Sequence, residues 1–462
     1  MINPLIYNMK RFLHLFFFLL CFYNVHSQGL ITSGPMLGWV EHRSALIWCE
    51  VSPEVRTATI RYWESNNAEY FYELDYTGDL GKPYNPIKFE LPKLKMDVLY
   101  NYEIFLNNKP VEFPYPLSFR TKKLWEYRTD APDFSFIMGS CNYLNDAQYD
   151  RPQQPAYGQD PVILKTMANI PADFTLWLGD NLYFREADLS SPAGMNYRYS
   201  YQRSYAEMQP LLVTRPNFAI WDDHDFGPND SHTSFEYKQE ALQLFKDYWT
   251  NKTYGEPDNP GIYGKFQWSD CEFFLMDDRY YRSPNEYDDS IGGKPNCNKV
   301  FWGARQMQWL KDNLITSRAT FKFIVTGSQT LNPMNKYECL RNYPCEYNEL
   351  MNFINQYKID GLVFLTGDRH ISEVIKTEPK NGYPLYDITS SPITSGVFAK
   401  IKDLPEYNNP SRVPNTLVME NNFTLISITR RDKDRILKMQ CYNKAGQVVA
   451  EFSLTASELK FK

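Results

Sequence analysis

The sequence has no basic excess, no internal repeat, no low-complexity segment and no apolar run long enough to span a bilayer. Its 462 residues include 49 Lys and Arg against 55 Asp and Glu, a net charge of −6 at pH 7. Because stable binding to nucleic acid depends on neutralising phosphates, this balance argues against a nucleic-acid complex. The length allows two domains, each with a large core.

The first 27 residues have the pattern of a secretory signal peptide. Lys10 and Arg11 form a positive region, an apolar stretch covers 12–23, and Val25-His26-Ser27 is an acceptable cleavage site before the mature chain. We therefore expect an exported protein, in the periplasm or outside the cell, with no transmembrane segment after cleavage. We also expect a monomer.

Two alternatives compete with cleaved export. The segment could remain as an anchor helix, but its apolar run is short for crossing a bilayer. Lipidation at Cys21 is a minor alternative, because Leu20 before it is too large for a typical lipoprotein box.

The cysteines indicate that at least one thiol serves a purpose other than pairing. Without Cys21 an odd set remains, namely Cys49, Cys141, Cys271, Cys297, Cys339, Cys345 and Cys441. In an oxidising compartment an odd thiol stays unpaired or binds something else. Cys339 and Cys345 could pair with each other, or one of them with Cys297. Cys49 and Cys271 lie in strand-like runs and are expected in the core.

Residues 28–128 are expected to form a small β-sandwich domain of the fibronectin or immunoglobulin type. Short β-rich runs punctuated by Pro, Gly and Asn are typical of such a module. The expected strands lie at 44–51, 58–63, 100–106 and 117–122.

Residues 132–462 are expected to form a second domain, in which strands and helices alternate as in an α/β fold. One helix is expected to begin at Asp160, with Asp and Pro at its start, and another is expected over 304–311. The Tyr-rich stretch 197–205 is expected to be a helix packed on the sheet, or alternatively a wall of the substrate cleft. The expected strands lie at 134–138, 173–178, 218–221, 273–276, 321–326, 361–365, 423–428 and 448–452.

Side chains able to bind a metal follow the ends of several of these strands. Cys141 follows the first strand of the α/β domain, Asp180 and Tyr183 follow the second, and Asp368 and His370 follow a later one. Carboxyl ends of adjacent strands face one crevice, so these side chains should converge. Two ionised Asp side chains in one crevice repel each other unless a multivalent cation lies between them. The pattern predicts a metal site with more than one ion.

A further acidic segment, Trp221-Asp222-Asp223-His224-Asp225, follows another expected strand and leads to Asn229 and Asp230. So many acids around one His favour a nearby cation. Thiolate and phenolate favour iron, whereas Asp and Asn oxygens favour Ca²⁺, Mg²⁺ or Mn²⁺. Two unlike ions joined through a shared Asp would suit phosphoester hydrolysis.

The chain resembles the PhoD-like alkaline phosphatase/phosphodiesterase family of the metallophosphatase superfamily. The resemblance is carried by Gly139-Ser140-Cys141, Gly179-Asp180 with Tyr183, the Asp-Asp-His segment and Gly367-Asp368-Arg369-His370, in that order, and by Gly34-Pro35-Met36-Leu37-Gly38-Trp39 near the start. It implies an α/β fold, a four-layer metallophosphatase-like α/β/β/α sandwich preceded by a small all-β sandwich domain.

The same resemblance implies the ligands of each ion. Fe³⁺ would be held by Cys141, Asp180, Tyr183 and His370. Ca²⁺ would be held by Asp180, Asn229 and Asp368, with Mg²⁺, Mn²⁺ or Zn²⁺ as alternatives at this second site. Here Asn229 is followed by Asp230, where the family often has a second Asn, so either side chain could meet the second ion.

The expected function is that of a secreted, metal-dependent phosphoric ester hydrolase of the alkaline phosphatase D type, acting on small phosphomonoesters or phosphodiesters through a metal-bridged hydroxide. His224 could act as a general acid or contact the substrate, or it could orient Asp222 or Asp223, which more naturally support the site than bind metal. Arg279, or Arg282 nearby, could hold phosphate oxygens as a bidentate fork. The alternatives are a phospholipase-like phosphodiesterase and a non-catalytic, metal-containing binding protein of the cell envelope.

Overall fold

The computed structural model describes residues 28–150, 157–158, 160–378, 382–431 and 434–462, so the expected signal peptide lies outside the described residues. The N-terminal part is all β and antiparallel, with a three-stranded sheet (β1-β2-β5) and a five-stranded sheet (β4-β3-β6-β7, with β8 on β6). Its elements are η1 (Gln28–Leu30), β1 (Ile31–Val40), β2 (Ala45–Val51), β3 (Ala58–Glu64), β4 (Phe71–Asp75), β5 (Asn85–Leu91), β6 (Leu99–Leu106), β7 (Lys109–Pro110) and β8 (Ser118–Arg120).

Buried residues alternate with half-buried or exposed ones along β3, β5 and β6, as expected of strands with one face on a core. Ile47, Ile60, Phe89 and Ile104 meet in a hydrophobic core that belongs to this region. Met36 and Trp48, in contrast, pack into the core of the rest of the chain. The domain boundary expected between 128 and 132 stays a prediction.

The remainder is a mixed α/β region built on two six-stranded sheets, β11-β10-β9-β20-β21-β22 and β12-β13-β16-β17-β19-β18. The strands are β9 (Phe134–Gly139), β10 (Phe174–Leu178), β11 (Asn217–Ile220), β12 (Gly264–Trp268), β13 (Cys271–Leu275), β16 (Phe321–Val325), β17 (Leu362–Thr366), β18 (Glu373–Thr377), β19 (Leu385–Thr389), β20 (Asn422–Arg431), β21 (Asp434–Asn443) and β22 (Val448–Thr455), with a separate hairpin of β14 (Ser290–Ile291) and β15 (Lys294–Pro295).

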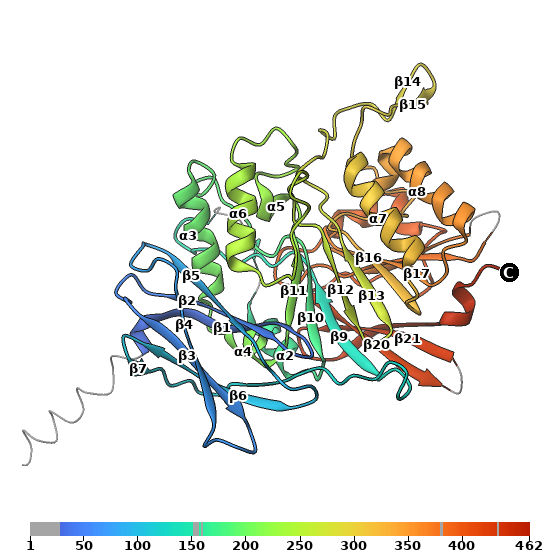
Figure 1. Cartoon of the computed structure of the whole chain (residues 1–462). Helices are drawn as coiled ribbons and strands as arrows, with labels where there is room; N and C mark the ends of the chain where they lie inside the picture. The colour runs from blue at the N-terminus through green and yellow to red at the C-terminus, as the bar shows by residue number, and fades with distance from the viewer. Residues whose placement is uncertain (1–27, 151–156, 159, 379–381, 432–433) are drawn as a thin grey trace, which may run out of the picture.

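The helices lie on the outer faces of the paired sheets. In Figure 1, α3 and α6 are on one side and α7 and α8 on the other, which gives the expected α/β/β/α order. The helices are α2 (Val162–Asn169), α3 (Pro192–Arg203), α4 (Gln209–Thr214), α5 (Asp223–Phe226), α6 (Lys238–Tyr248), α7 (Ala304–Thr316) and α8 (Pro344–Tyr357), and the short 3-10 turns are η2 (Leu340–Asn342), η3 (Ala399–Asp403), η4 (Pro405–Asn408) and η5 (Ala456–Leu459).

Aromatic side chains fill the space between the two sheets. Phe136 of β9 and Phe174 of β10 stack with ring centroids 4.9 Å apart, and Phe136 meets Phe273 of β13 edge-on at 5.2 Å. Phe273 in turn stacks on Phe323 of β16 at 4.8 Å. Such ring pairs add to the free energy gained by burying their area, so this layer fixes one sheet against the other.

The disulfide follows one of the two open alternatives. Cys297 pairs with Cys345, which ties the segment after β15 to α8, and Cys339 is buried and free. The other free cysteines in the described ranges are also buried, namely Cys49, Cys141, Cys271 and Cys441.

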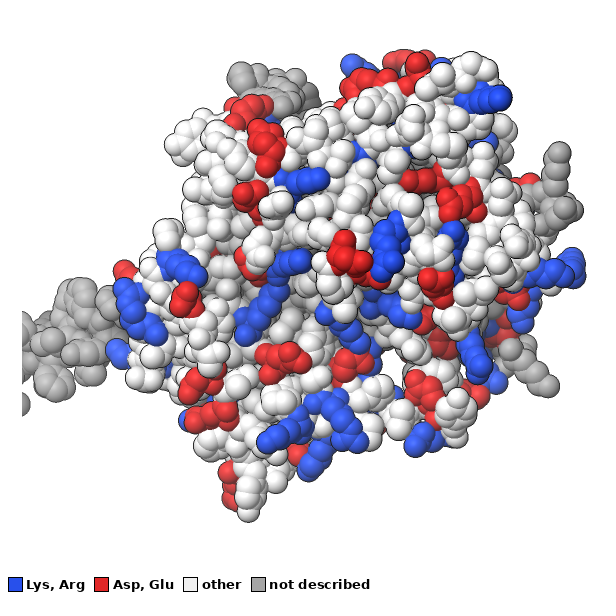
Figure 2. Space-filling view, turned by 45° about the horizontal axis from the view of Figure 1, so that its top comes forward, with Lys and Arg blue, Asp and Glu red and all other residues white. Residues whose placement is uncertain are grey.

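No helix in the described part of the chain is long and apolar enough to cross a membrane. Acidic and basic side chains are interspersed over the described face shown in Figure 2, in keeping with the small net charge.

Candidate metal centre

The sheets bring the expected ligands to one edge. β10 runs parallel to both β9 and β11, so the segments that carry Cys141, Asp180 and Asp223 leave the sheet on the same side. The segment after β17, in the other sheet, approaches them closely at Gly367. A Cβ at Gly367 would lie 2.6 Å from Cβ of Ser140 and 2.7 Å from O of Leu178. The glycine therefore allows the ends of the two sheets to meet.

The backbone is strained at the residues that meet there. Cys141, Asp180, Asp368 and His370 have φ angles of 60°, 48°, 63° and 54°. Such left-handed conformations are uncommon outside glycine, and strained residues tend to gather at functional sites. Four of the six expected metal ligands share this feature, which marks the edge as the candidate site.

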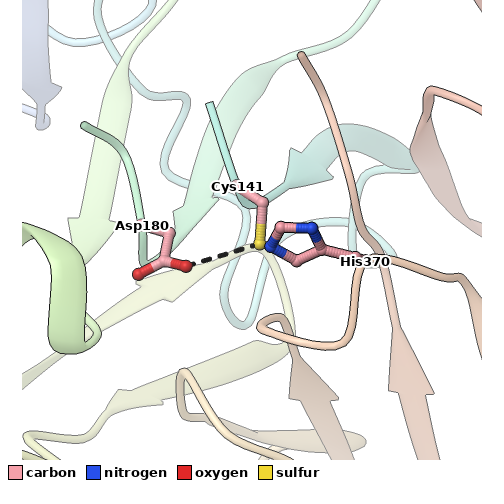
Figure 3. A group of neighbouring side chains, drawn as sticks. All are labelled: Cys141, Asp180 and His370. Carbon is pink, nitrogen blue, oxygen red and sulfur yellow. Dashed lines mark hydrogen bonds between the residues drawn. The ribbon is translucent and has the colours of Figure 1, made fainter. Parts of the chain in front are cut away.

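Cys141, Asp180, Tyr183 and His370 form one ligand set, and Figure 3 shows three of its members, Cys141, Asp180 and His370. Ligand atoms of Cys141, Asp180 and His370 lie within 4.8 Å of one another, and Sγ of Cys141 is 3.6 Å from Oδ2 of Asp180. The Tyr183 hydroxyl donates to Oδ2 of Asp180 at 3.0 Å and lies 3.2 Å from Nε2 of His370. These thiol, carboxyl, phenol and imidazole groups face a common centre.

Contacts behind this set fix the orientation of His370 and Cys141. Nδ1 of His370 lies 2.5 Å from the carbonyl O of Gly396, so Nδ1 carries the proton and Nε2 offers its lone pair to the centre. The Ser391 hydroxyl donates to Sγ of Cys141 at 3.1 Å. A donor at the sulfur stabilises a thiolate.

Carboxylates form a second group beside the first. Asp180, Asp223 and His224 lie within 4.8 Å of one another through their ligand atoms, as do Asp222, Glu338 and Asp368, and Asp223, Asp230 and Glu338. One oxygen of Asp368, Oδ2, is buried and has no hydrogen-bond partner in the part of the chain that the structure describes. A buried, unpartnered carboxylate oxygen is costly unless a cation meets it.

The electrostatics of the ligands fit bound cations. Burial, followed by the negative charge of Asp223, raises the pKa of Asp180 well above its usual range, and burial raises the pKa of Asp368 in the same way. Burial also raises the pKa of Cys141 and, with the charge of Asp180, that of Tyr183. A multivalent cation would favour the charged form of every one of these groups, so the residues present suit metal binding.

A cavity of about 1150 Å³ opens onto this centre. Among the expected site residues, Asp180, Asp223, His224, Asn229, Asp368 and His370 line it. Cys141 and Tyr183 are buried beneath it, next to Tyr143 and Tyr157. Asn229 and Asp230 both line the cavity, and Nδ2 of Asn229 donates to Oδ2 of Asp230 at 2.6 Å. Residues 197–203 of the Tyr-rich stretch lie in α3, which agrees with a helix, and residues 204 and 205 follow its end.

Arg279 does not line the cavity, in contrast to the phosphate-binding role expected for it. Its side chain is fully buried, Nε donates to Oδ1 of Asp222 at 2.5 Å, and Nη1 and Nη2 donate to Glu338 at 3.0 and 2.5 Å. Arg282, also fully buried, donates to Glu338 at 2.8 Å. The guanidinium groups are thus held by carboxylates behind the cavity wall.

Glu338 was not identified from the sequence, because it lies in a polar loop and follows no strand. Although burial raises its pKa, the charges of Arg279 and Arg282 outweigh burial and lower it, so Glu338 is ionised. The signal that could have revealed it is indirect. Two arginines beside a buried strand end need buried counter-charges, and Asp222 supplies only one.

A model of the family described as PhoD-like phosphatase matches residues 153–433. Alkaline phosphatase D of Bacillus subtilis (strain 168) is 23% identical over 384 residues, which cover 71% of this chain and 62% of that protein's length. The match thus spans less than two thirds of that relative.

Solved structures show the same fold. A structure of PhoD superposes with a TM-score of 0.73 at 17% identity and covers 93% of both chains. The purple acid phosphatase PPD1 from yellow lupin seeds superposes with a TM-score of 0.63 at 12% identity, covering 91% of this chain and 73% of that one. At these identities the likeness establishes the architecture alone.

Glu338→Gln should lower the free energy of unfolding by about 3 kcal/mol, because it leaves two buried guanidinium groups with too little counter-charge. Denaturant unfolding at neutral pH measures the loss. The pKa of Glu338 is lowered in the folded state. Its contribution to the free energy of unfolding is therefore present above the unfolded pKa of 4.5 and is lost as the pH falls below that value. The difference between variant and wild type should therefore shrink below about pH 4.5.

Glu349→Gln is the matched control. Glu349 pairs with Lys311 at the surface, with 46% of its side chain exposed, so its loss should cost less than about 1 kcal/mol. Equal destabilisation by the two substitutions would contradict the role given to Glu338.

Proposed function

The chain belongs to the PhoD-like phosphatase family, and from this membership we propose that it is a metal-dependent phosphoric ester hydrolase of the alkaline phosphatase D type. Its substrates would be small phosphomonoesters or phosphodiesters. The observation that carries the proposal is the convergence of Cys141, Asp180, Tyr183 and His370 with a second group of carboxylates at the floor of an open cavity. Structural metal sites are normally closed by protein donors, so an open site favours an enzyme over a binding protein.

The ligand chemistry supports two unlike ions. The thiol, phenol and imidazole of the first set suit Fe³⁺. Asp180, Asn229 and Asp368 supply oxygens that suit Ca²⁺, with Mg²⁺, Mn²⁺ or Zn²⁺ as alternatives. When bound, such ions acidify water and hold phosphoryl oxygens. Asp180 is the shared ligand in this proposal, because one of its oxygens faces Cys141 and Tyr183 and the other accepts from the His224 backbone N–H at 3.2 Å.

His224 is the side chain best placed to contact a substrate in the cavity. Its ring lies 4.2 Å from that of Tyr183, and Nε2 lies 3.8 Å from Oδ2 of Asp223. Burial lowers the pKa of His224 against the opposing charge of Asp223, so the imidazole is neutral at alkaline pH. We therefore assign His224 a hydrogen bond to the phosphoester, with Asp223 orienting the ring.

Arg279 takes a positioning role in this proposal. Its guanidinium group bridges Asp222 and Glu338 and is fully buried, so it can fix the carboxylates that surround the second ion. Binding phosphate oxygens directly would require breaking these ion pairs, and leaving a buried carboxylate unpaired costs several kcal/mol.

Export remains part of the proposal. The disulfide between Cys297 and Cys345 supports an oxidising compartment, where such bonds persist. The signal-peptide pattern in the first 27 residues points the same way.

The iron assignment predicts a coloured protein. A phenolate bound to Fe³⁺ absorbs visible light, so Tyr183→Phe should abolish most of the visible band, and Cys141→Ala should lower the iron content. Absorption spectra and metal analysis of the same samples measure both effects. Tyr143→Phe is a matched control, because Tyr143 lies beside Tyr183 in the same aromatic cluster but its hydroxyl donates to Asp150. An unchanged spectrum and iron content in both site variants would rule out these ligands.

The calcium assignment predicts that activity can be lost while the bound iron and its colour remain. A chelator selective for Ca²⁺ should strip an ion held by Asp and Asn oxygens before one held by thiolate and phenolate. Turnover of a chromogenic phosphomonoester and of a diester should then fall at least tenfold while the colour persists, and it should return when Ca²⁺ is added. Hydrolysis that survives complete removal of Ca²⁺ would exclude a role for calcium in the reaction. Absence of turnover with every metal added would contradict the proposed function.

A further inference from the structure

The cavity is much larger than the reacting group it is proposed to hold. Its volume of about 1150 Å³ exceeds the usual size of pockets for drug-sized ligands, whereas a phosphoryl group needs only a small part of it. Its lining includes the carboxylates and histidines of the candidate site and also the side chains of Tyr337, Val397, Phe398 and Met419. A substrate that used the whole cavity would carry a sizeable apolar group beside its phosphate.

The apolar part of the lining contains an aromatic pair. The rings of Tyr337 and Phe398 lie 6.0 Å apart and nearly perpendicular, at 86°. They come from different segments, since Tyr337 lies in the loop before η2 and Phe398 directly precedes η3. Tyr337 is 54% exposed, which is unusual for a large side chain packed against another ring. Its free surface faces a cavity, where a ligand could cover it.

Arg369 fixes this pair relative to the metal centre. Its guanidinium carbon lies 5.4 Å from the Tyr337 ring centroid and 5.5 Å from that of Phe398. Glu406 accepts two hydrogen bonds from Arg369, at 3.0 and 2.9 Å, and also one from Asn332 at 2.8 Å. These contacts hold the guanidinium group in one place.

The backbone also links the aromatic pair to the metal centre. Arg369 lies between Asp368 and His370, two of the expected metal ligands. The backbone N–H of Phe398 donates to the carbonyl O of His370 at 3.0 Å. The aromatic pair therefore packs against the short segment that supplies two of the ligands, and its place relative to the centre is fixed by its contacts with Arg369 and by this hydrogen bond.

We propose that Tyr337 and Phe398 form a subsite for a planar aromatic group carried by the phosphoester, with Tyr337 as the residue that determines specificity. The inference deepens the proposed function and rests on it for the phosphate end of the substrate. An aromatic group placed against the exposed face of Tyr337 removes apolar area from water and adds a ring–ring contact. A saturated group of the same size gains the area alone.

The test measures binding rather than turnover. Three phosphonates that are not hydrolysed, namely ethylphosphonate, 2-phenylethylphosphonate and 2-cyclohexylethylphosphonate, carry the same charged group and differ only in the substituent. Isothermal titration of the metal-loaded protein gives each Kd. The phenylethyl compound should bind roughly tenfold more tightly than the ethyl compound, as one ring–ring contact allows. It should also bind several-fold more tightly than the cyclohexyl compound.

Variants of Tyr337 and Phe398 test whether the preference for the phenylethyl compound comes from these two rings. In Tyr337→Ala and Phe398→Ala the ratio of the ethyl to the phenylethyl Kd should fall to about two or less. In Tyr337→Phe, which keeps the ring, the ratio should stay near the wild-type value. Tyr357→Ala is the control, because Tyr357 is similarly exposed, at 47%, but lies at the end of α8 and does not line the cavity.

The possible results distinguish failure of the aromatic subsite from failure of the proposed phosphoesterase function. A wild-type ratio near one, or a ratio that Tyr337→Ala leaves unchanged, would overturn the aromatic subsite and leave the phosphoesterase proposal standing. Cyclohexyl binding as tight as phenylethyl binding would overturn the preference for planar groups. If no phosphonate bound the metal-loaded protein, the phosphate site itself would fail, and the subsite with it.

Discussion

Repulsion among buried carboxylates is the constraint on which the centre depends. Asp180, Asp222, Asp223, Glu338 and Asp368 lie close together at the candidate metal centre, and all of them are buried except Asp368, which is half-buried. Asp222 and Glu338 are neutralised within the protein by two buried arginines, Arg279 and Arg282. Among the described residues no Lys or Arg forms an ion pair with Asp180 or Asp368, and one oxygen of Asp368 is buried there without a hydrogen bond. The protein thus neutralises the periphery of the cluster with its own cations and leaves the centre to ions from solution.

The fold supplies the means to hold such a cluster together. The aromatic layer between the sheets fixes their separation, and Gly367 lets the end of β17 come within van der Waals distance of the ends of β9 and β10. The ligands then leave the strands through left-handed backbone turns, which aim their side chains inward. This strain is a cost in stability, of order 1–3 kcal/mol at each residue, that the surrounding packing has to offset. The segment 368–370 has two roles in the cavity, because it carries metal ligands and also holds the aromatic pair in place.

Much of the architecture could be predicted from the sequence, and the reasons are local. Buried strands such as 173–178 and 361–365 are largely apolar runs, and a Gly-Asp pair follows within one residue of each. The structure places β10 and β17 within a residue of these predictions. Cys141, Asp180, Asp368 and His370 could be chosen because position at a strand end is a property of the sequence itself. The expected helix 304–311 begins where α7 begins but is shorter, because the sequence marks helix starts better than helix ends.

What could not be predicted depends on contacts between distant segments. Arg279 follows a strand and was expected to face a phosphate, but Glu338, 59 residues further on, lies against it and holds it behind the wall. The disulfide partner of Cys345 is 48 residues away, and the sequence leaves Cys339, which lies much closer in the chain, as an open alternative. The pairing of Tyr337 with Phe398 likewise has no local signal. Loops carry these partners, and their approach is fixed only by the packed sheets.

The most direct test of the central claim is the metal content and turnover of Asp180→Asn. This substitution preserves the size of the side chain and removes the charge that the two proposed ions would share. Both metals should be depleted, and phosphoester turnover should fall roughly 100-fold or more, a larger loss than that of Asn229→Ala, which removes a ligand of one ion only. Wild-type metal content and near wild-type turnover in Asp180→Asn would contradict the assignment of Asp180 as a ligand shared by both ions.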